Sequence, residues 1–550
     1  MRLLGEVLLE KEMVTSQHMR LALQEQKRTG ELLGKVLLRL GILTRKDLSR
    51  AVAFSSDLPF IDLKEAHIDL NAIRTVPKEI AGKFRLIPFA VEDNTIRVAM
   101  DNPNDVVAID TLRRKTRMKI EACASDLEGI MESIEIYYEV GASLEDEMDK
   151  NINAALAGGI AEGEVSPPIV RLIELFMIKA VRDGATDIHI TPEETTTRVS
   201  YRVDGVLRSG IIVPKQLHVP IVTRIKVMCR LDIAEQRLPQ EGNIIFEFSG
   251  RNIDIRSSTS PKNFGENVVL RVLDKTNVTL GLEHLGLGKE NQASIRRLTM
   301  KPHGLILTAG PTGSGKTTTL YSMLREINAL EKNVLTIEDP IEYHLPLIKQ
   351  TQVNEQAGLT FHEAIRHFLR QDPDIMLVGE IRDLETAGIC FQAAMTGHLV
   401  LSTIHTNDAA STIARLLDLG VEPYLIPSSL RAAVAQRLVR RICPACVEEY
   451  VPSAGELDLY GLKEWAGAGK TLKRGKGCED CERTGYSGRT GIFEIMEVTP
   501  HISRLISRKT SSDMIMAEAQ KEGLRSMKED GLDKVLAGIT TVEEVFRVTE

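Results

Sequence analysis

The chain has 550 residues, of which 43% are hydrophobic and 27% are charged. This composition excludes wholesale disorder and collagen-like repeats, and the length allows about three to five domains. No apolar run approaches the ~20 residues of a membrane span, and the first residues lack a signal-peptide pattern, so we expect a cytoplasmic protein. The net charge of −8 and the 4% of aromatic residues argue against a nucleic-acid coat protein and against stacking platforms for single strands.

An internal repeat opens the chain. Residues 3–9 (LLGEVLL) recur as residues 32–38 (LLGKVLL). A second amphipathic helix is expected after each copy, with Thr15 or Ser16 and then Thr44 as N-caps. The repeat therefore predicts a small helical bundle made by duplication.

Changes in composition divide the rest of the chain. Short β-like runs alternate with polar helices, and an acidic, Gly/Ala-rich stretch that we interpret as a flexible linker separates two such regions. After the linker we expect a helix that starts at Pro167, followed by strands at residues 187–190, 197–203, 244–248 and 253–257. From about Gly281 onward, strands and helices alternate in the way that is typical of a parallel sheet with crossover helices. The predicted segments are a helical module (1–57), an α/β domain (58–140), the linker (141–166), a second α/β domain (167–275) and the parallel-sheet domain (281–550).

A glycine-rich loop follows an apolar run in the last of these domains. Residues 310–317 match G-x-x-x-x-G-K-[ST], between a predicted buried strand at 305–308 and a predicted helix at 318–328. Glycines let backbone N–H groups face phosphate oxygens, the lysine adds a point charge, and the threonine hydroxyl ligates Mg²⁺. We therefore expect ATP or ADP and magnesium to bind here. The candidate residues are Gly310, Pro311, Thr312, Gly313, Ser314, Gly315, Lys316 (also catalytic), Thr317 (also a magnesium ligand) and Thr318.

Two further apolar runs end in acidic residues. Residues 334–337 lead to Glu338 and Asp339, and residues 374–378 lead through a glycine to Glu380. Because the carboxyl ends of parallel strands face the ligand crevice, these carboxylates fit metal binding and water activation. Glu380 is expected to hold Mg²⁺ or to orient the attacking water.

Two histidines bracket a third apolar run. His398 precedes residues 399–404 and His405 follows them. We interpret both as completing the same edge, where an imidazole can contact the γ-phosphate. A purely structural role for them stays open.

Four of the seven cysteines form two C-x₂-C pairs, an arrangement typical of a structural Zn²⁺ site. The gap between the pairs predicts an inserted helix around 454–466, within a zinc-binding insertion at 441–485. Redox chemistry is the alternative. The expected zinc ligands are Cys443, Cys446, Cys478 and Cys481, whereas Cys123, Cys229 and Cys390 are expected to be buried thiols.

Together these residues resemble the secretion ATPases of type II secretion and type IV pilus assembly, over essentially the whole chain. The resemblance is carried by a Walker A loop (310–317), an "Asp box" (335–343), a Walker B segment (370–383) and a "His box" (396–408). The cysteine insertion resembles that of the assembly and export branch, which favours an extension motor over a retraction motor.

The resemblance implies a RecA-like P-loop ATPase core preceded by a PAS-like α/β domain and by helical and α/β N-terminal domains, assembled as a hexamer. It implies that Glu338 polarises the attacking water and that Glu380 orients Mg²⁺ or water. His398 and His405 match the His-box positions of the family.

The resemblance also implies that arginines of the PAS-like domain approach the phosphates, partly across subunits. Arg256 and Arg271 match those positions best, and Arg202 and Arg237 match them less well. The alternative is that these are surface arginines on strands. An arginine delivered in this way stabilises transition-state charge.

The N-terminal repeat resembles a cyclic di-GMP-binding module found on some of these ATPases. Leu3 and Leu32 stand where that module has arginine, and Glu12 stands where its first copy has glycine, so we expect weak or no binding of the dinucleotide. The alternative is a docking domain for the inner-membrane platform protein or its cytoplasmic adaptor.

The sequence therefore predicts a hexameric Mg²⁺-dependent ATPase that hydrolyses ATP to ADP and phosphate to power type IV pilus or type II pseudopilus assembly. It is expected at the cytoplasmic face of the inner membrane. A nucleic-acid translocase of the same superfamily and a regulatory module that does not hydrolyse ATP are the alternatives.

Overall fold

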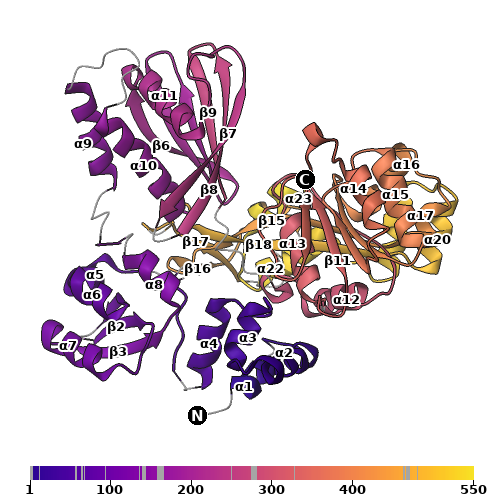
Figure 1. Ribbon diagram of the computed structural model, residues 1–550, viewed down its shortest axis with the longest axis horizontal. Coiled ribbons are helices and arrows are strands. Elements are labelled where there is room, and N and C mark those ends of the chain that lie inside the picture. The colour runs from indigo at the N-terminus through magenta and orange to yellow at the C-terminus, as the bar shows by residue number, and fades with distance from the viewer. Residues whose placement is uncertain are drawn as a thin grey trace. The chain divides into compact units, whose positions relative to one another are not determined.

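The computed structural model describes residues 4–11, 13–55, 58–63, 66, 68–92, 95–134, 137–138, 144–157, 166–248, 251–273, 281–327, 329–462, 465, 471–479 and 481–550. The chain divides into two compact units (Figure 1), Met1–Leu38 with Leu43–Asn277 and Arg39–Ile42 with Val278–Glu550. Among the described residues, no helix is long and apolar enough to cross a membrane.

The N-terminal repeat forms two helix pairs, as predicted. Thr15 Oγ1 accepts a hydrogen bond from the His18 amide at 3.1 Å, and Thr44 Oγ1 accepts one from the Asp47 amide at 3.1 Å. Both threonines therefore cap the second helix of their pair. Leu3 and Glu12 lie outside the described residues. The helices are α1 (Leu4–Glu10), α2 (Ser16–Thr29), α3 (Leu33–Arg39) and α4 (Arg45–Ser55).

The next domain is a small three-stranded sheet with helices, as predicted. β1 and β2 are antiparallel and β2 and β3 are parallel, and the β-like runs of residues 86–89 and 96–100 lie in β1 and β2. The elements are α5 (Leu70–Thr75), α6 (Lys78–Phe84), β1 (Leu86–Glu92), β2 (Thr95–Met100), α7 (Val106–Thr116), β3 (Lys119–Ala124) and α8 (Leu127–Ile134).

The prediction of a flexible linker is wrong for most of its described residues. α9 (Leu144–Ala157) occupies them and packs against α10 (Pro167–Arg182) (Figure 1). Apolar residues recur along α9 at helical spacing among the acidic ones, so one face is buried although the composition is polar. The buried residues are Leu144, Met148, Ile152 and Ala155.

The second α/β domain is an antiparallel six-stranded sheet in the order β6-β5-β4-β9-β8-β7, with α10 and α11 (His218–Cys229) packed together in its core. The helix predicted to start at Pro167 and all four expected strands are present, and β6 and β9 were not predicted. The strands are β4 (Ala185–Pro192), β5 (Thr196–Val203), β6 (Val206–Pro214), β7 (Gln240–Phe248), β8 (Arg251–Lys262) and β9 (Gly265–Leu273).

The second unit contains a seven-stranded sheet in the order β12-β11-β13-β14-β10-β15-β18. All neighbours are parallel except β15 and β18. This confirms the predicted parallel sheet and the RecA-like core. The strands are β10 (Gly304–Ala309), β11 (Val334–Glu338), β12 (Lys349–Gln352), β13 (Ile375–Val378), β14 (Leu399–Ile404), β15 (Leu430–Ile442) and β18 (Tyr486–Glu497).

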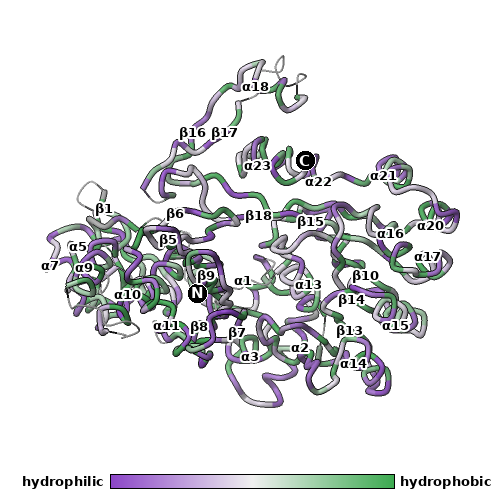
Figure 2. The backbone as a smooth tube through the Cα atoms, turned by 90° about the horizontal axis from the view of Figure 1, so that it is seen from above, coloured by the Kyte–Doolittle hydropathy of each residue, from purple (hydrophilic) through white to green (hydrophobic). Residues whose placement is uncertain are grey.

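Helices cover both faces of this sheet. Leu305 and Leu307 of β10 point to one core and Ile306 points to the other, because side chains alternate along a strand. Both cores are apolar, and green segments run through the strands between the helices in Figure 2. The helices on the first face include α14 (Phe361–Phe368), α15 (Leu384–Met395), α16 (Ala409–Asp418) and α17 (Leu425–Ser429), and those on the second include α12 (Lys289–Thr299) and α13 (Lys316–Arg325).

The cysteine insertion projects from the ends of β15 and β18 as a two-stranded hairpin (Figure 2). Its helix is shorter than predicted, since it ends at Leu459; residues 463, 464 and 466 of the predicted range lie outside the described part of the chain. A separate apolar core joins the insertion to the last helices. The elements are β16 (Val447–Tyr450), α18 (Ala454–Leu459), β17 (Leu472–Gly475), α22 (Met527–Leu536) and α23 (Val542–Thr549).

Candidate functional site

The glycine-rich loop joins the carboxyl end of β10 to the amino end of α13. Gly315 has a φ of 87°, in the left-handed region that glycine adopts readily. A Cβ on Gly310 would lie 2.8 Å from the carbonyl oxygen of Gln436, so the loop packs on β15 too closely for a side chain. The loop ends at the amino terminus of α13, whose free backbone N–H groups and positive dipole end favour phosphate oxygens.

The loop lysine lies over the loop itself. Lys316 Nζ donates to the carbonyl oxygens of Gly310 at 2.8 Å and Pro311 at 2.9 Å. Burial lowers the pKa of Lys316 to about 8; Glu380 opposes this shift and Arg437 adds to it. The charge of Lys316 therefore interacts with the Glu380 carboxylate and with the Arg437 guanidinium.

Within the part of the chain that the structure describes, one buried hydroxyl group of the loop lacks a hydrogen-bond partner, as a loop that binds a polar ligand would require. Among the described residues, the buried Ser314 hydroxyl has no hydrogen-bond partner. Its backbone, in contrast, is fixed, because Gln436 Nε2 donates to the Ser314 carbonyl oxygen at 2.6 Å. Thr317, in the first turn of α13, is half-buried. A magnesium-bound triphosphate supplies the kind of polar partner that the Ser314 hydroxyl lacks among these residues.

Glu380 follows β13 at the same sheet edge. Its carboxylate pairs with Arg382, and His405 Nε2 lies 3.4 Å from Glu380 Oε2. His405 follows β14, the strand next to β13. The structure thus brings Lys316, Glu380 and His405 together, as the sequence analysis expected.

Glu338 ends β11 and is buried, with 3% of its surface exposed. Its Oε1 accepts hydrogen bonds from Thr336 Oγ1 at 2.5 Å and from Gln350 Nε2 at 3.1 Å. Its Oε2 accepts one from the Tyr321 hydroxyl. The carboxylate is therefore held by α13, β11 and β12 at once.

His398 does not belong to this edge, which corrects the sequence interpretation. It precedes β14 and its carbonyl oxygen accepts from Gly304 at the start of β10, so it lies at the amino ends of the strands. Six residues of β-strand span about 20 Å, which separates His398 from the loop. Its Nδ1 lies 3.0 Å from the Ala393 carbonyl oxygen, a local structural contact.

Sequence reasoning missed two residues of β15. Gln436 is 1% exposed and binds the loop backbone, and Arg437 Nη2 donates to the Asn407 carbonyl oxygen at 3.1 Å. Burial lowers the pKa of Arg437, and the nearby Asp408 and Glu494 oppose that shift. These two polar residues interrupt the apolar run of residues 432–439 (AAVAQRLV), and this interruption could have indicated a functional role from the sequence.

The four paired cysteines meet in one cluster, with all their Sγ atoms within 4.8 Å of one another. Sγ–Sγ distances of 3.9 Å (Cys443 to Cys478), 3.8 Å (Cys446 to Cys481) and 3.7 Å (Cys478 to Cys481) match the ~3.8 Å edge of a tetrahedron with Zn–S bonds of about 2.3 Å. The Gly485 amide donates to Cys481 Sγ at 3.2 Å, as a thiolate ligand favours. The cluster therefore fits zinc. The remaining thiols, Cys123, Cys229 and Cys390, are buried as expected.

Known proteins place this chain in a family. The family described as "Type II/IV secretion system protein" matches residues 162–547. The type IV pilus assembly ATPase PilB of Myxococcus xanthus (strain DK1622) is 39% identical to this chain, covering 98% of both. The type II secretion system ATPase E of Vibrio cholerae serotype O1 is 45% identical over 87% of this chain and 97% of that one. The chain belongs to this family and is a secretion ATPase.

A solved structure agrees on the fold of this secretion ATPase. The ATPase DotB of Legionella pneumophila superposes with a TM-score of 0.50 over 69% of this chain and 95% of its own, at 19% identity. The family described as "MshEN domain" matches residues 56–144. That match falls on the first α/β domain of the secretion ATPase rather than on the helical repeat, and weak or no dinucleotide binding by the repeat stays a prediction.

The arginines expected from the PAS-like domain lie on its sheet. Arg256 of β8 faces Arg271 of β9 in register. Arg271 Nε lies 3.1 Å from Asp187 Oδ1, and Arg202 Nε lies 3.7 Å from Asp187 Oδ2. Arg271 and Arg202 thus flank the buried Asp187 carboxylate and Arg256 lies beside Arg271 on the next strand, whereas Arg237 is 90% exposed and pairs with Glu235.

Proposed function

We propose that this secretion ATPase hydrolyses ATP to ADP and phosphate with Mg²⁺ at the loop of residues 310–317. The observation that carries the proposal is the glycine loop at the amino end of α13, with Lys316 over it, at the same sheet edge where Glu380 meets His405. A cation, an acid and a row of amides at one sheet edge suit phosphoryl transfer.

Each residue has a part in the proposed reaction. The loop amides and Lys316 hold the β- and γ-phosphates, with Gly310 to Thr318 forming the pocket. Thr317 and Glu380 hold Mg²⁺, which when bound neutralises the phosphate oxygens. Glu338 orients the attacking water and accepts its proton, and His405 contacts the γ-phosphate beside Glu380.

We also propose that the active form is a hexamer in which Arg256 and Arg271 approach the phosphates, partly from a neighbouring subunit. Asp187 holds Arg271 in place, and Arg271 is still 59% exposed and so free to meet an anion. Such an arginine contributes a factor of ~10³–10⁵ in rate in other phosphate-loop enzymes.

The names of the relatives support the proposal that hydrolysis powers type IV pilus or type II pseudopilus assembly. The enzyme then works at the cytoplasmic face of the inner membrane, through a polytopic platform protein and a cytoplasmic adaptor. ATP binding between subunits would close the two central domains and product release would reopen them. In this proposal the zinc cluster is structural, because its four thiolates leave no open coordination position.

The test is phosphate release by purified wild-type protein and by Glu380→Gln. The variant should retain ATP and lose nearly all turnover, since one ligand of Mg²⁺ and water is removed. Glu385→Gln, which changes a glutamate of α15 that is 68% exposed, is the matched control and should turn over normally. Wild-type turnover in Glu380→Gln would contradict the assignment.

The same assay separates the alternatives. No stimulation by single-stranded or duplex DNA is expected, and strong stimulation would support a nucleic-acid translocase instead. No phosphate release by the wild type, even with its membrane partner, would support a regulatory module.

A further inference from the structure

A buried polar cluster surrounds Glu338 between α13, β11 and β12. Both carboxylate oxygens accept hydrogen bonds: Oε2 from Tyr321, and Oε1 from Thr336 and Gln350. Gln350 is fixed in turn, since its Oε1 accepts from the Leu345 amide at 2.7 Å. The orientation of the carboxylate is therefore set by its donors.

Tyr321 is suited to act as a permanent donor. It is fully buried, and its ring packs edge-on against Tyr343 with 4.5 Å between centroids. Burial, and then the charge of Glu338, raise the pKa of Tyr321 far above its ordinary value, so the hydroxyl stays protonated. A protonated hydroxyl at this position donates its hydrogen bond to Glu338 Oε2.

We infer that Tyr321 positions Glu338 for water activation, assisted by Gln350. The inference rests on the catalytic role proposed above for Glu338. The position of Tyr321 in the chain explains how it can do so. Helix α13 begins at Lys316, so the same helix carries the lysine proposed to bind the phosphates and, five residues later, the tyrosine that holds Glu338. The distance from phosphate to base is thereby tied to one helix and to its hydrogen bond with the end of β11, which fixes the geometry for attack.

The neighbouring tyrosine offers a matched control. Tyr343 is also largely buried and belongs to the same aromatic pair, but among the described residues its hydroxyl has no hydrogen-bond partner. Tyr321→Phe and Tyr343→Phe thus remove the same atom from two sides of one pair. Only the first removes a hydrogen bond to Glu338.

The experiment measures kcat, KM and the dissociation constant of a fluorescent ATP analogue for both variants. Tyr321→Phe should lower kcat about tenfold, equivalent to about 1.4 kcal/mol, and leave KM and nucleotide affinity within about twofold. Tyr343→Phe should leave all three near wild type. Gln350→Met, which removes the side-chain amide that donates to Glu338 Oε1, should also lower kcat without weakening nucleotide binding.

A double-mutant cycle distinguishes positioning from a general structural effect. In a Glu338→Gln background, single-turnover cleavage of labelled ATP should not fall further when Tyr321→Phe is added. A further tenfold loss there, equal effects of the two tyrosine variants, or a parallel loss of nucleotide affinity would overturn the inference. Normal turnover of Glu338→Gln would overturn the role of Glu338 as well, whereas an inactive Glu338→Gln with a normal Tyr321→Phe would overturn the positioning alone.

Discussion

At Lys316 the protein environment opposes the charge that the reaction needs. The ammonium group is partly dehydrated, and a pKa of about 8 leaves roughly nine-tenths of it charged at pH 7. The carbonyl oxygens of Gly310 and Pro311 accept hydrogen bonds from this ammonium group. An arriving polyphosphate brings negative charge that raises the pKa again, so binding the anion and keeping the proton are linked.

This linkage predicts a pH dependence of nucleotide binding. Because only the protonated lysine favours the anion, affinity for ADP should be nearly constant from pH 7 to 7.5 and should fall as pH rises above about 8. Titration of fluorescent ADP at a series of pH values measures it. Lys316→Ala should bind weakly with no such fall, and an equal fall in that variant would refute the role of Lys316.

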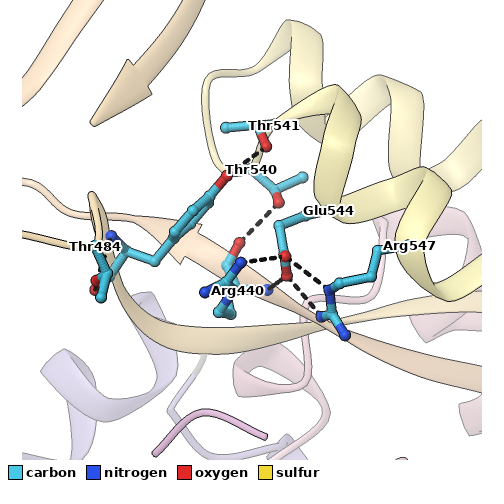
Figure 3. A network of polar contacts seen from close by, with 7 residues as sticks. Arg440, Thr484, Thr540, Thr541, Glu544 and Arg547 are labelled. Atoms are coloured by element: carbon cyan, nitrogen blue, oxygen red, sulfur yellow. Dashed lines mark hydrogen bonds and ion pairs between the residues drawn. The ribbon is translucent and has the colours of Figure 1, made fainter. Parts of the chain in front are cut away.

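At the scale of elements, β15 connects three parts of the ATPase domain. Its central residue Gln436 holds the phosphate loop, and its carboxyl-terminal end meets α23 through an ion-pair network around the buried Glu544 (Figure 3). Burial raises the pKa of Glu544, but hydrogen bonds from Arg547 and Arg440 outweigh it and bring that pKa to about 2. The Arg440 guanidinium also lies 4.1 Å from the ring centre of Tyr486, which begins β18. The ends of β15 and β18, where the cysteine insertion begins and ends, are therefore stabilised by contacts that need no metal.

We expect the stability of the β16–β17 hairpin to depend on the four cysteines. We expect about one zinc per chain by metal analysis, and we expect Cys478→Ser to lose it and to expose the β16–β17 hairpin to protease, because structural zinc contributes folding energy directly. Cys390→Ala changes a buried thiol of α15 and should retain the metal. Full zinc content in Cys478→Ser would contradict the ligand assignment.

At the scale of the molecule, the proposed chemistry is divided between the two units. The phosphate loop belongs to the second unit, and the arginines around Asp187 belong to the first. If these arginines complete the phosphate site of a neighbouring subunit, as proposed above, motion of one subunit against another would open and close that site.

Mixing two inactive variants tests this division. Lys316→Ala supplies intact arginines and Arg271→Ala supplies an intact loop. If Arg271 acts across subunits, mixed oligomers should regain a measurable part of the wild-type phosphate release, whereas each variant alone stays inactive. Mixtures that remain as inactive as their parts would exclude action across subunits, and normal turnover by Arg271→Ala alone would exclude the arginine.

Much of the site was predictable because its signals are local. The glycines of the loop and the pairs of cysteines depend on spacing over a few residues, and the strands around them show as short apolar runs. The helix α9 escaped prediction because acidic composition concealed an apolar face that shows only at helical spacing.

The sequence by itself determined that a triphosphate loop, acidic strand ends and a four-thiol site exist here, since each is written in neighbouring residues. Only the tertiary structure decided which of them meet. Strand direction places His405 beside Glu380 and sends His398 to the opposite end of β14. Contacts between elements far apart in the chain place Gln436 under the loop and Tyr321 on Glu338. Such contacts depend on strand order and burial, which no local pattern encodes.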